Sequence, residues 1–212
     1  MKDFSISMAL VDYIPVIFFA IAVIILLRDL YNKMGKGAFA LFAAGAIDII
    51  AAGALKATYK LLYAAGVCDF VALSDMFFPV QSIGFLLAGI GTVLMLCDKR
   101  AGKACFAVAP PFFSGTFVFV SLMVIGLGCM DAGLSIISFK LKKPWLTALF
   151  ATSFVCSLCM GYLSSKNFTE AAMNWIAEGV NVIGQGALLV GVLLLHRFGL
   201  CELDLQKNQS LD

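Results

Sequence analysis

Long apolar stretches separated by short polar segments make up most of this chain. A helix needs about 20 mostly apolar residues to cross the hydrocarbon core of a bilayer. The clearly delimited stretches cover residues 9–27, 38–63, 78–96, 145–163 and 171–195. Each approaches or exceeds that length, and the polar segments between them are short. The pattern predicts an all-α integral membrane protein with little structure outside the membrane.

Residues 104–139 are apolar too, but harder to divide. They contain a single charged residue, Asp131. One straight helix of this length would be about 54 Å long, against a hydrocarbon core of about 30 Å. Pro110-Pro111 and Ser114-Gly115 interrupt helices, so we expect the chain to bend here. The region therefore holds one span or two, and the protein has six or seven transmembrane helices.

The basic residues help to choose between these numbers, because Lys and Arg concentrate in cytoplasmic loops. Six spans divide them almost evenly between the two sides of the membrane. Seven spans leave only Lys2, Lys56, Lys60 and Lys166 on the side of the N-terminus. Charge thus favours seven spans, with the N-terminus outside and the C-terminus cytoplasmic. Length favours six, because two spans of about 18 residues are at the lower limit. We expect seven.

A short internal repeat suggests two related halves. The sequence of residues 40–43 recurs at 148–151, an offset of 108, and Ile83-Gly84 with Gly91 recur at an offset of 100. Seven spans would then form a 3+1+3 arrangement with parallel halves, and six would form inverted 3+3 halves. We divide the chain into an N-terminal three-helix half with its basic linker (1–103), a bent hydrophobic region (104–139), C-terminal helices (140–201) and a polar tail (202–212).

The 3+1+3 arrangement resembles the SWEET and PQ-loop transporters in size and layout. However, Pro79-Val80-Gln81 differs from the Pro-Gln dipeptide of that family, and we assign the chain to no family on this basis.

Composition agrees with a membrane protein: 62% of the residues are hydrophobic and 13% charged, whereas soluble domains have about 25% charged residues. A net charge of +2 gives no reason to expect nucleic-acid binding. The seven cysteines are an odd number without the spacing of a disulfide framework. The single histidine, His196, cannot form a multi-histidine zinc site or ligate a haem twice. We expect no metal and no cofactor.

Glu178, Asn181 and Gln185 are the most informative polar residues, because they interrupt the last apolar stretch at spacings i, i+3 and i+7. That spacing places them on one helical face. Ionisable groups inside a membrane are costly and usually face a partner, a cavity or a solute. They could line a solute path in which Glu178 exchanges protons. Alternatively, the amides join helices and Glu178 pairs with a lysine.

The second and third stretches carry further polar residues. Asp48 is near the centre of its stretch and needs a partner, such as Lys56 on the same helix. We expect Lys60 to extend toward the membrane surface. Gln81 aligns with Asn181 in the repeat, so two amides could face each other across the two halves.

These residues define the predicted solute site: Glu178, Asn181, Gln185, Asp48, Lys56 and Gln81. The function we expect is that of a transporter or channel-like protein that binds a small polar or charged solute between two helical halves. Its partners would be that solute and membrane lipids, and self-association stays open. One alternative is a membrane-embedded enzyme acting on a lipid or quinone, with Glu178 or Asp48 as general base. Another is a non-catalytic partner subunit.

Overall fold

The computed structural model describes residues 5–97, 116–163 and 171–203, and every regular element within them is helical. Six helical segments are long and apolar enough to cross a membrane, which confirms the all-α fold and is compatible with a multi-pass membrane protein. The elements are α1 (Ile6–Val11), α2 (Tyr13–Leu30), α3 (Lys36–Ala64), α4 (Ala72–Asp75), α5 (Phe77–Leu96), α6 (Thr116–Lys140), η2 (Pro144–Leu146), α7 (Thr147–Leu163) and α8 (Ala171–Arg197).

Asp12 separates α1 from α2, although both belong to one apolar segment. Pro15 explains the interruption, because proline has no N–H to donate to the carbonyl group of Val11 and its ring crowds that carbonyl. Ser5 caps α1 by accepting a hydrogen bond from the backbone N–H of Met8. The interruption leaves Asp12 buried inside the bundle, where it becomes part of the site described below.

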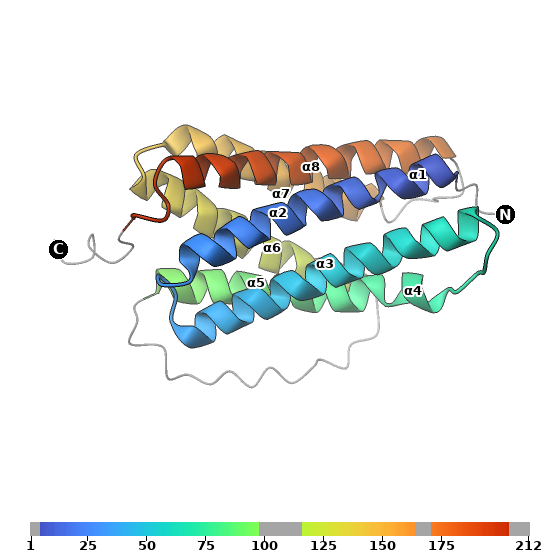
Figure 1. The fold of residues 1–212 in the computed structure, drawn as a ribbon, viewed down its shortest axis with the longest axis horizontal. Helices are drawn as coiled ribbons and strands as arrows, with labels where there is room; N and C mark the ends of the chain where they lie inside the picture. Colours follow the sequence, from blue (N-terminus) through green and yellow to red (C-terminus); the bar gives the residue numbers. More distant parts are fainter. Residues whose placement is uncertain (1–4, 98–115, 164–170, 204–212) are drawn as a thin grey trace.

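Helices α5 and α6 pack side by side and run in the same direction (Figure 1). Gly89 of α5 faces Gly126 of α6, and Thr92, one turn further along α5, faces Gly133, further along α6. The end of α5 and the start of α6 consequently lie at opposite ends of the bundle. Helices α2 and α8 also run parallel (Figure 1): Phe18 of α2 lies beside Gly186 of α8, and Asp29 contacts His196 further along both helices.

Residues 116–140 form one uninterrupted helix. The bend expected at Pro110-Pro111 and Ser114-Gly115 lies outside the described residues. The structure therefore contains six apolar helices in its described parts, and a seventh crossing stays a prediction.

Small residues make matching contacts in the N-terminal half (α1–α5) and the C-terminal half (α6–α8). Each contact below has a counterpart at an offset of 108 residues for α3 and α7, 100 for α5 and α8, and 104 for α2 and α6. The matched pairs are Gly84–Gly45 with Gly184–Ser153, Gly91–Phe42 with Gly191–Phe150, and Gly53–Val16 with Gly161–Val120. Two of these offsets are those of the sequence repeat, so the repeated residues occupy equivalent places in the packing.

The two ends of the bundle differ in composition. At one end, where α2, α5, α6 and α8 finish, apolar side chains fill the interior: Leu26, Leu30, Phe42, Leu134, Ile137, Leu146, Phe150 and Leu195. Basic residues surround this end, which we call the basic end: Arg28, Lys33, Lys36, Lys140, Lys142, Lys143 and Arg197. The opposite end, which we call the cavity end, is hollow.

Candidate functional site

A cavity of about 470 Å³ occupies the cavity end. Helices α2, α3, α5, α6, α7 and α8 all contribute side chains to it, so its wall comes from both halves of the chain. Five of the six predicted site residues line it: Lys56, Gln81, Glu178, Asn181 and Gln185. The fold thus brings together polar groups that are up to 129 positions apart in the sequence, from Lys56 to Gln185 (185 − 56).

Asp48 is the predicted residue that does not line this cavity. It lies where α3 passes α5, with its Cβ next to Gly84. The suggested pairing with Lys56 does not form, because eight residues along a helix separate the two side chains by about 12 Å. Among the described residues, Asp48 makes no ion pair.

A buried group of three charged residues closes one side of the cavity. The ammonium group of Lys60 lies 2.5 Å from Asp12 Oδ2 and 2.9 Å from Glu178 Oε1. Asp12, Lys60 and Glu178 are 7%, 6% and 3% exposed. They come from the α1–α2 junction, α3 and α8, so this carboxylate–lysine–carboxylate group joins the two halves.

The expectation that Lys60 extends to the membrane surface is wrong. Asp12 and Glu178 lie within ion-pair distance of the Lys60 ammonium group. A buried ammonium group is stable when anionic groups pair with it in this way. For Glu178, the lysine pairing that we considered as an alternative to a solute path does occur. Glu178 nevertheless also lines the cavity, so the two interpretations are compatible.

The group contains one more acid than base. Glu178 Oε2 is buried and receives no hydrogen bond from the described residues while both acids are ionised. The carboxyl group of Asp12 is near enough to act as its hydrogen-bond partner, but only if one of the two acids carries a proton. The arrangement can therefore hold a single proton between two carboxyl groups.

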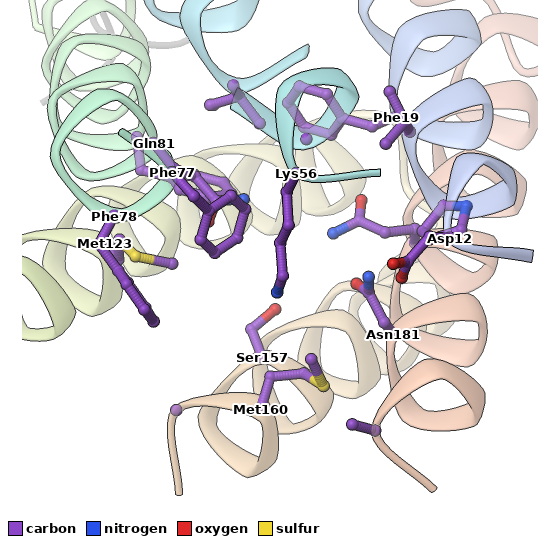
Figure 2. A pocket seen from close by; sticks show the side chains of 18 of the residues that line it. Asp12, Phe19, Lys56, Phe77, Phe78, Gln81, Met123, Ser157, Met160 and Asn181 are labelled. Atoms are coloured by element: carbon purple, nitrogen blue, oxygen red, sulfur yellow. The ribbon is translucent and has the colours of Figure 1, made fainter. Parts of the chain in front are cut away.

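Lys56, one turn before Lys60, has a different environment. Its side chain extends from α3 into the middle of the cavity, with the ring of Phe77 on one side and Asn181 on the other (Figure 2). Its ammonium group lies 4.1 Å from the centre of the Phe77 ring, a cation–π contact. No described carboxylate forms an ion pair with it.

Gln81 of α5 and Asn181 of α8 lie on different sides of Lys56 (Figure 2). The repeat alignment had suggested that these amides face each other across the two halves. Gln81 Oε1 and Gln185 Oε1 are buried without a hydrogen-bond donor among the described residues. The rest of the wall is mainly apolar and combines aliphatic side chains with phenylalanine and methionine residues: Phe19, Phe77, Phe78, Phe85, Phe154, Met123 and Met160.

Sequence reasoning left several polar residues of the wall out of the predicted site, among them Asp12, Lys60 and Asn174. Asp12 was noted only as an interruption of the first apolar stretch, Lys60 was assigned to the membrane surface, and Asn174 was overlooked. Asn174 precedes Glu178 by four residues, so it extends the polar stripe on α8 by one turn. That spacing was a usable signal. Nothing in the sequence indicates that Asp12 meets Lys60.

The other candidate residues lie outside this cavity. Cys156 packs against Gly184 and Cys159 is exposed, as expected for small residues on a helix surface. His196 Nδ1 lies 2.7 Å from Asp29 Oδ2 near the basic end. In the described ranges, no three His, Cys, Asp or Glu side chains gather in a way that could hold a metal ion.

No protein-family model, curated protein or solved structure matches this chain significantly.

Proposed function

We propose that this protein is a membrane carrier that binds a small polar or charged solute in the cavity between its two halves. The observation that carries the proposal is the cavity itself: about 470 Å³, lined by charged and amide side chains from both halves. Polar groups inside a membrane are retained mainly where they serve a partner or a solute. Carrier folds built from two repeats commonly place their site at such an interface.

The contrast between the two ends supports alternating access. The cavity occupies one end, and close-packed apolar side chains such as Phe42, Leu134 and Phe150 fill the other. A channel would need a continuous polar path, which the apolar packing interrupts. A carrier needs one end closed while the other is accessible, and the two halves would rock about the site to exchange these states.

The direction of the helices supports a 3+1+3 arrangement. Because α5 and α6 run parallel, the end of α5 and the start of α6 lie at opposite ends of the bundle, as a 3+1+3 arrangement requires. The additional crossing falls outside the described residues and stays a prediction. The matching glycine contacts favour halves that arose by duplication and share the same orientation.

The distribution of charge gives the orientation. Apart from Lys56 and Lys60, every Lys and Arg in the described part of the chain lies near the basic end. The basic end would therefore be cytoplasmic, with the N-terminus and the cavity end outside.

Solute binding can be tested with two tryptophan substitutions on α7. Ser157 lines the cavity, whereas Val155 is 55% exposed on the outer surface of the same helix. Purified protein is screened for solutes that raise its melting temperature, and the positive solutes are tested for flux in proteoliposomes. Ser157→Trp should abolish both signals, and Val155→Trp should keep them. If both variants keep the signals, the solute does not use this cavity. A lipid product formed by the pure protein would indicate an enzyme instead.

Orientation can be tested with the native cysteines. Cys68 is exposed near the cavity end and Cys201 near the basic end. In intact cells, a membrane-impermeant maleimide should label a variant that keeps only Cys68. It should label a variant that keeps only Cys201 after the cells are opened. The reverse pattern would contradict the proposed orientation.

A further inference from the structure

The charged residues of the cavity fall into two sets: three that form ion pairs with one another, and Lys56, which forms none with the described residues. Lys60 is paired with both Asp12 and Glu178, and all three side chains are nearly fully buried. Lys56 is half-buried; its ammonium group lies over the Phe77 ring and forms no ion pair with a described carboxylate. The charge available to a solute is therefore positive. The carboxylate oxygen of Glu178 that Lys60 does not contact is buried, so a cationic solute could reach it only if the charged group rearranged.

Beside this ammonium group are a hydrogen-bond donor and an apolar wall. Asn181 lies near the Lys56 amine in the close view of the cavity (Figure 2), and its amide NH₂ can donate to an oxyanion. Phe77, Phe78, Met123 and Met160 line the neighbouring wall. An anionic head between Lys56 and Asn181 would thus carry an apolar body along the aromatic and methionine side chains.

The charge balance of the cavity indicates that a proton would bind together with an anionic solute. The ionised side chains of the described wall are Lys56 and Lys60 of α3, Asp12 at the α1–α2 junction and Glu178 of α8. The wall residues contributed by α5, α6 and α7 are uncharged, and Tyr59, the remaining titratable group, donates its phenol proton to Asp69. The four charges sum to zero, so a bound monoanion leaves one negative charge inside the membrane. One proton between Asp12 and Glu178 restores neutrality and also supplies the hydrogen bond that Glu178 Oε2 lacks.

We propose that the solute is an organic monoanion with an apolar, aryl-sized body, bound through Lys56 and Asn181, and that one proton on the Asp12–Glu178 pair travels with it. This inference rests on the proposed carrier function and names the substrate class of the same site. The proton comes from water at the cavity end, binds one carboxylate oxygen and leaves at the basic end together with the anion. The loaded and the empty carrier are then both neutral inside the membrane, which avoids the cost of moving a net charge through it.

Four probes that share an aryl body test the head group: phenylacetate, phenylacetamide, phenethylamine and phenylalanine. Calorimetry in detergent should give the tightest binding for phenylacetate. Lys56→Gln should weaken phenylacetate binding by about ten- to one-hundredfold, because a charge-assisted hydrogen bond is lost, and leave phenylacetamide unchanged. Lys56→Arg keeps the charge and should recover most of the affinity. Equal or tighter binding of the amide, the amine or the zwitterion would overturn the head-group assignment.

The proton is tested with phenylmethanesulfonate, a permanent anion that does not cross lipid unaided. In proteoliposomes, an inward proton gradient should drive its accumulation without generating a membrane potential. Glu178→Gln should abolish the accumulation but keep exchange of labelled for unlabelled anion, which shows that the variant is folded and binds. Accumulation that persists in Glu178→Gln, or flux that generates a potential, would overturn proton coupling.

These outcomes separate the inference from the carrier function. If another charge class is transported through the cavity and the anions are not, the substrate assignment is wrong and the carrier function stands. If solutes of every charge class fail to bind and to move, the carrier function is wrong as well.

Discussion

The cavity end and the basic end of this bundle are built from the same helices but differ in what fills the space between them. At the basic end, Phe42, Phe150 and Leu195 are fully buried members of one apolar core. At the cavity end, the helices surround a cavity that is lined by Lys56, Asn181 and the buried charged group. The comparison indicates that apolar packing stabilises the basic end, whereas paired buried charges stabilise the end that contains the cavity.

The largest effect is expected at the charged group of the cavity end. Lys60→Met leaves Asp12 and Glu178 buried without their cation, which should cost about 4 kcal/mol of unfolding free energy. Adding Asp12→Asn and Glu178→Gln removes the uncompensated charges and should recover most of that loss. Reversible unfolding in mixed micelles measures both values. A triple variant as unstable as Lys60→Met would mean that lost packing, rather than unpaired charge, causes the effect.

The second prediction compares aromatic residues at the two ends. Phe150 is fully buried, so Phe150→Ala should cost about 3 kcal/mol through lost packing. Phe78 borders the cavity, and Phe78→Ala should cost clearly less because its side chain already has empty space on one side. Thermal unfolding in detergent compares the two variants directly. Equal losses would contradict the division into a packed end and a hollow end.

The third prediction concerns the repeated glycines. A Cβ at Gly91 would lie 2.7 Å from the carbonyl oxygen of Ala38, so Gly91→Ala should cost about 2 kcal/mol. Gly191→Ala should cost less, because its Cβ would meet the ring of Phe150, which can shift, rather than backbone. Gly179→Ala on the same helix meets nothing and should be neutral or slightly stabilising. Melting temperatures in detergent should follow this order. Destabilisation by Gly179→Ala would show that helix propensity does not govern that position.

The smallest effect is expected at the Asp29–His196 pair near the basic end. His196→Ala removes the 2.7 Å contact to the buried Asp29 carboxylate and should cost about 1 kcal/mol. The double variant His196→Ala/Asp29→Asn should be no less stable than the single one, because no buried carboxylate remains. Unfolding free energies of both single variants, His196→Ala and Asp29→Asn, and of the double variant test the coupling. Strictly additive losses would mean that the contact contributes nothing.

Much of the candidate site was predictable because helical spacing is a local property. Glu178, Asn181 and Gln185 share a face by their spacing alone, and the fold turns that face into the cavity. From the sequence, Asp48 seemed an equally strong candidate for the site, yet it lies beside Gly84 at a helix contact. Local spacing gives the face that a residue occupies on its own helix. It does not give what the neighbouring helix presents to that face.

By itself, the sequence determined the helical class, the positions of the apolar helices and the repeat whose offsets recur in the glycine contacts. These features depend on hydrophobicity and on the spacing of small residues, which are properties of neighbouring positions in the chain. Only the tertiary structure decided that Lys60 joins Asp12 to Glu178 while Lys56 faces an open cavity. In the sequence, the two lysines look alike, because they lie one helical turn apart in the same apolar stretch. Their environments differ because acidic residues 48 and 118 positions away from Lys60 (60 − 12 and 178 − 60) form ion pairs with Lys60 and not with Lys56.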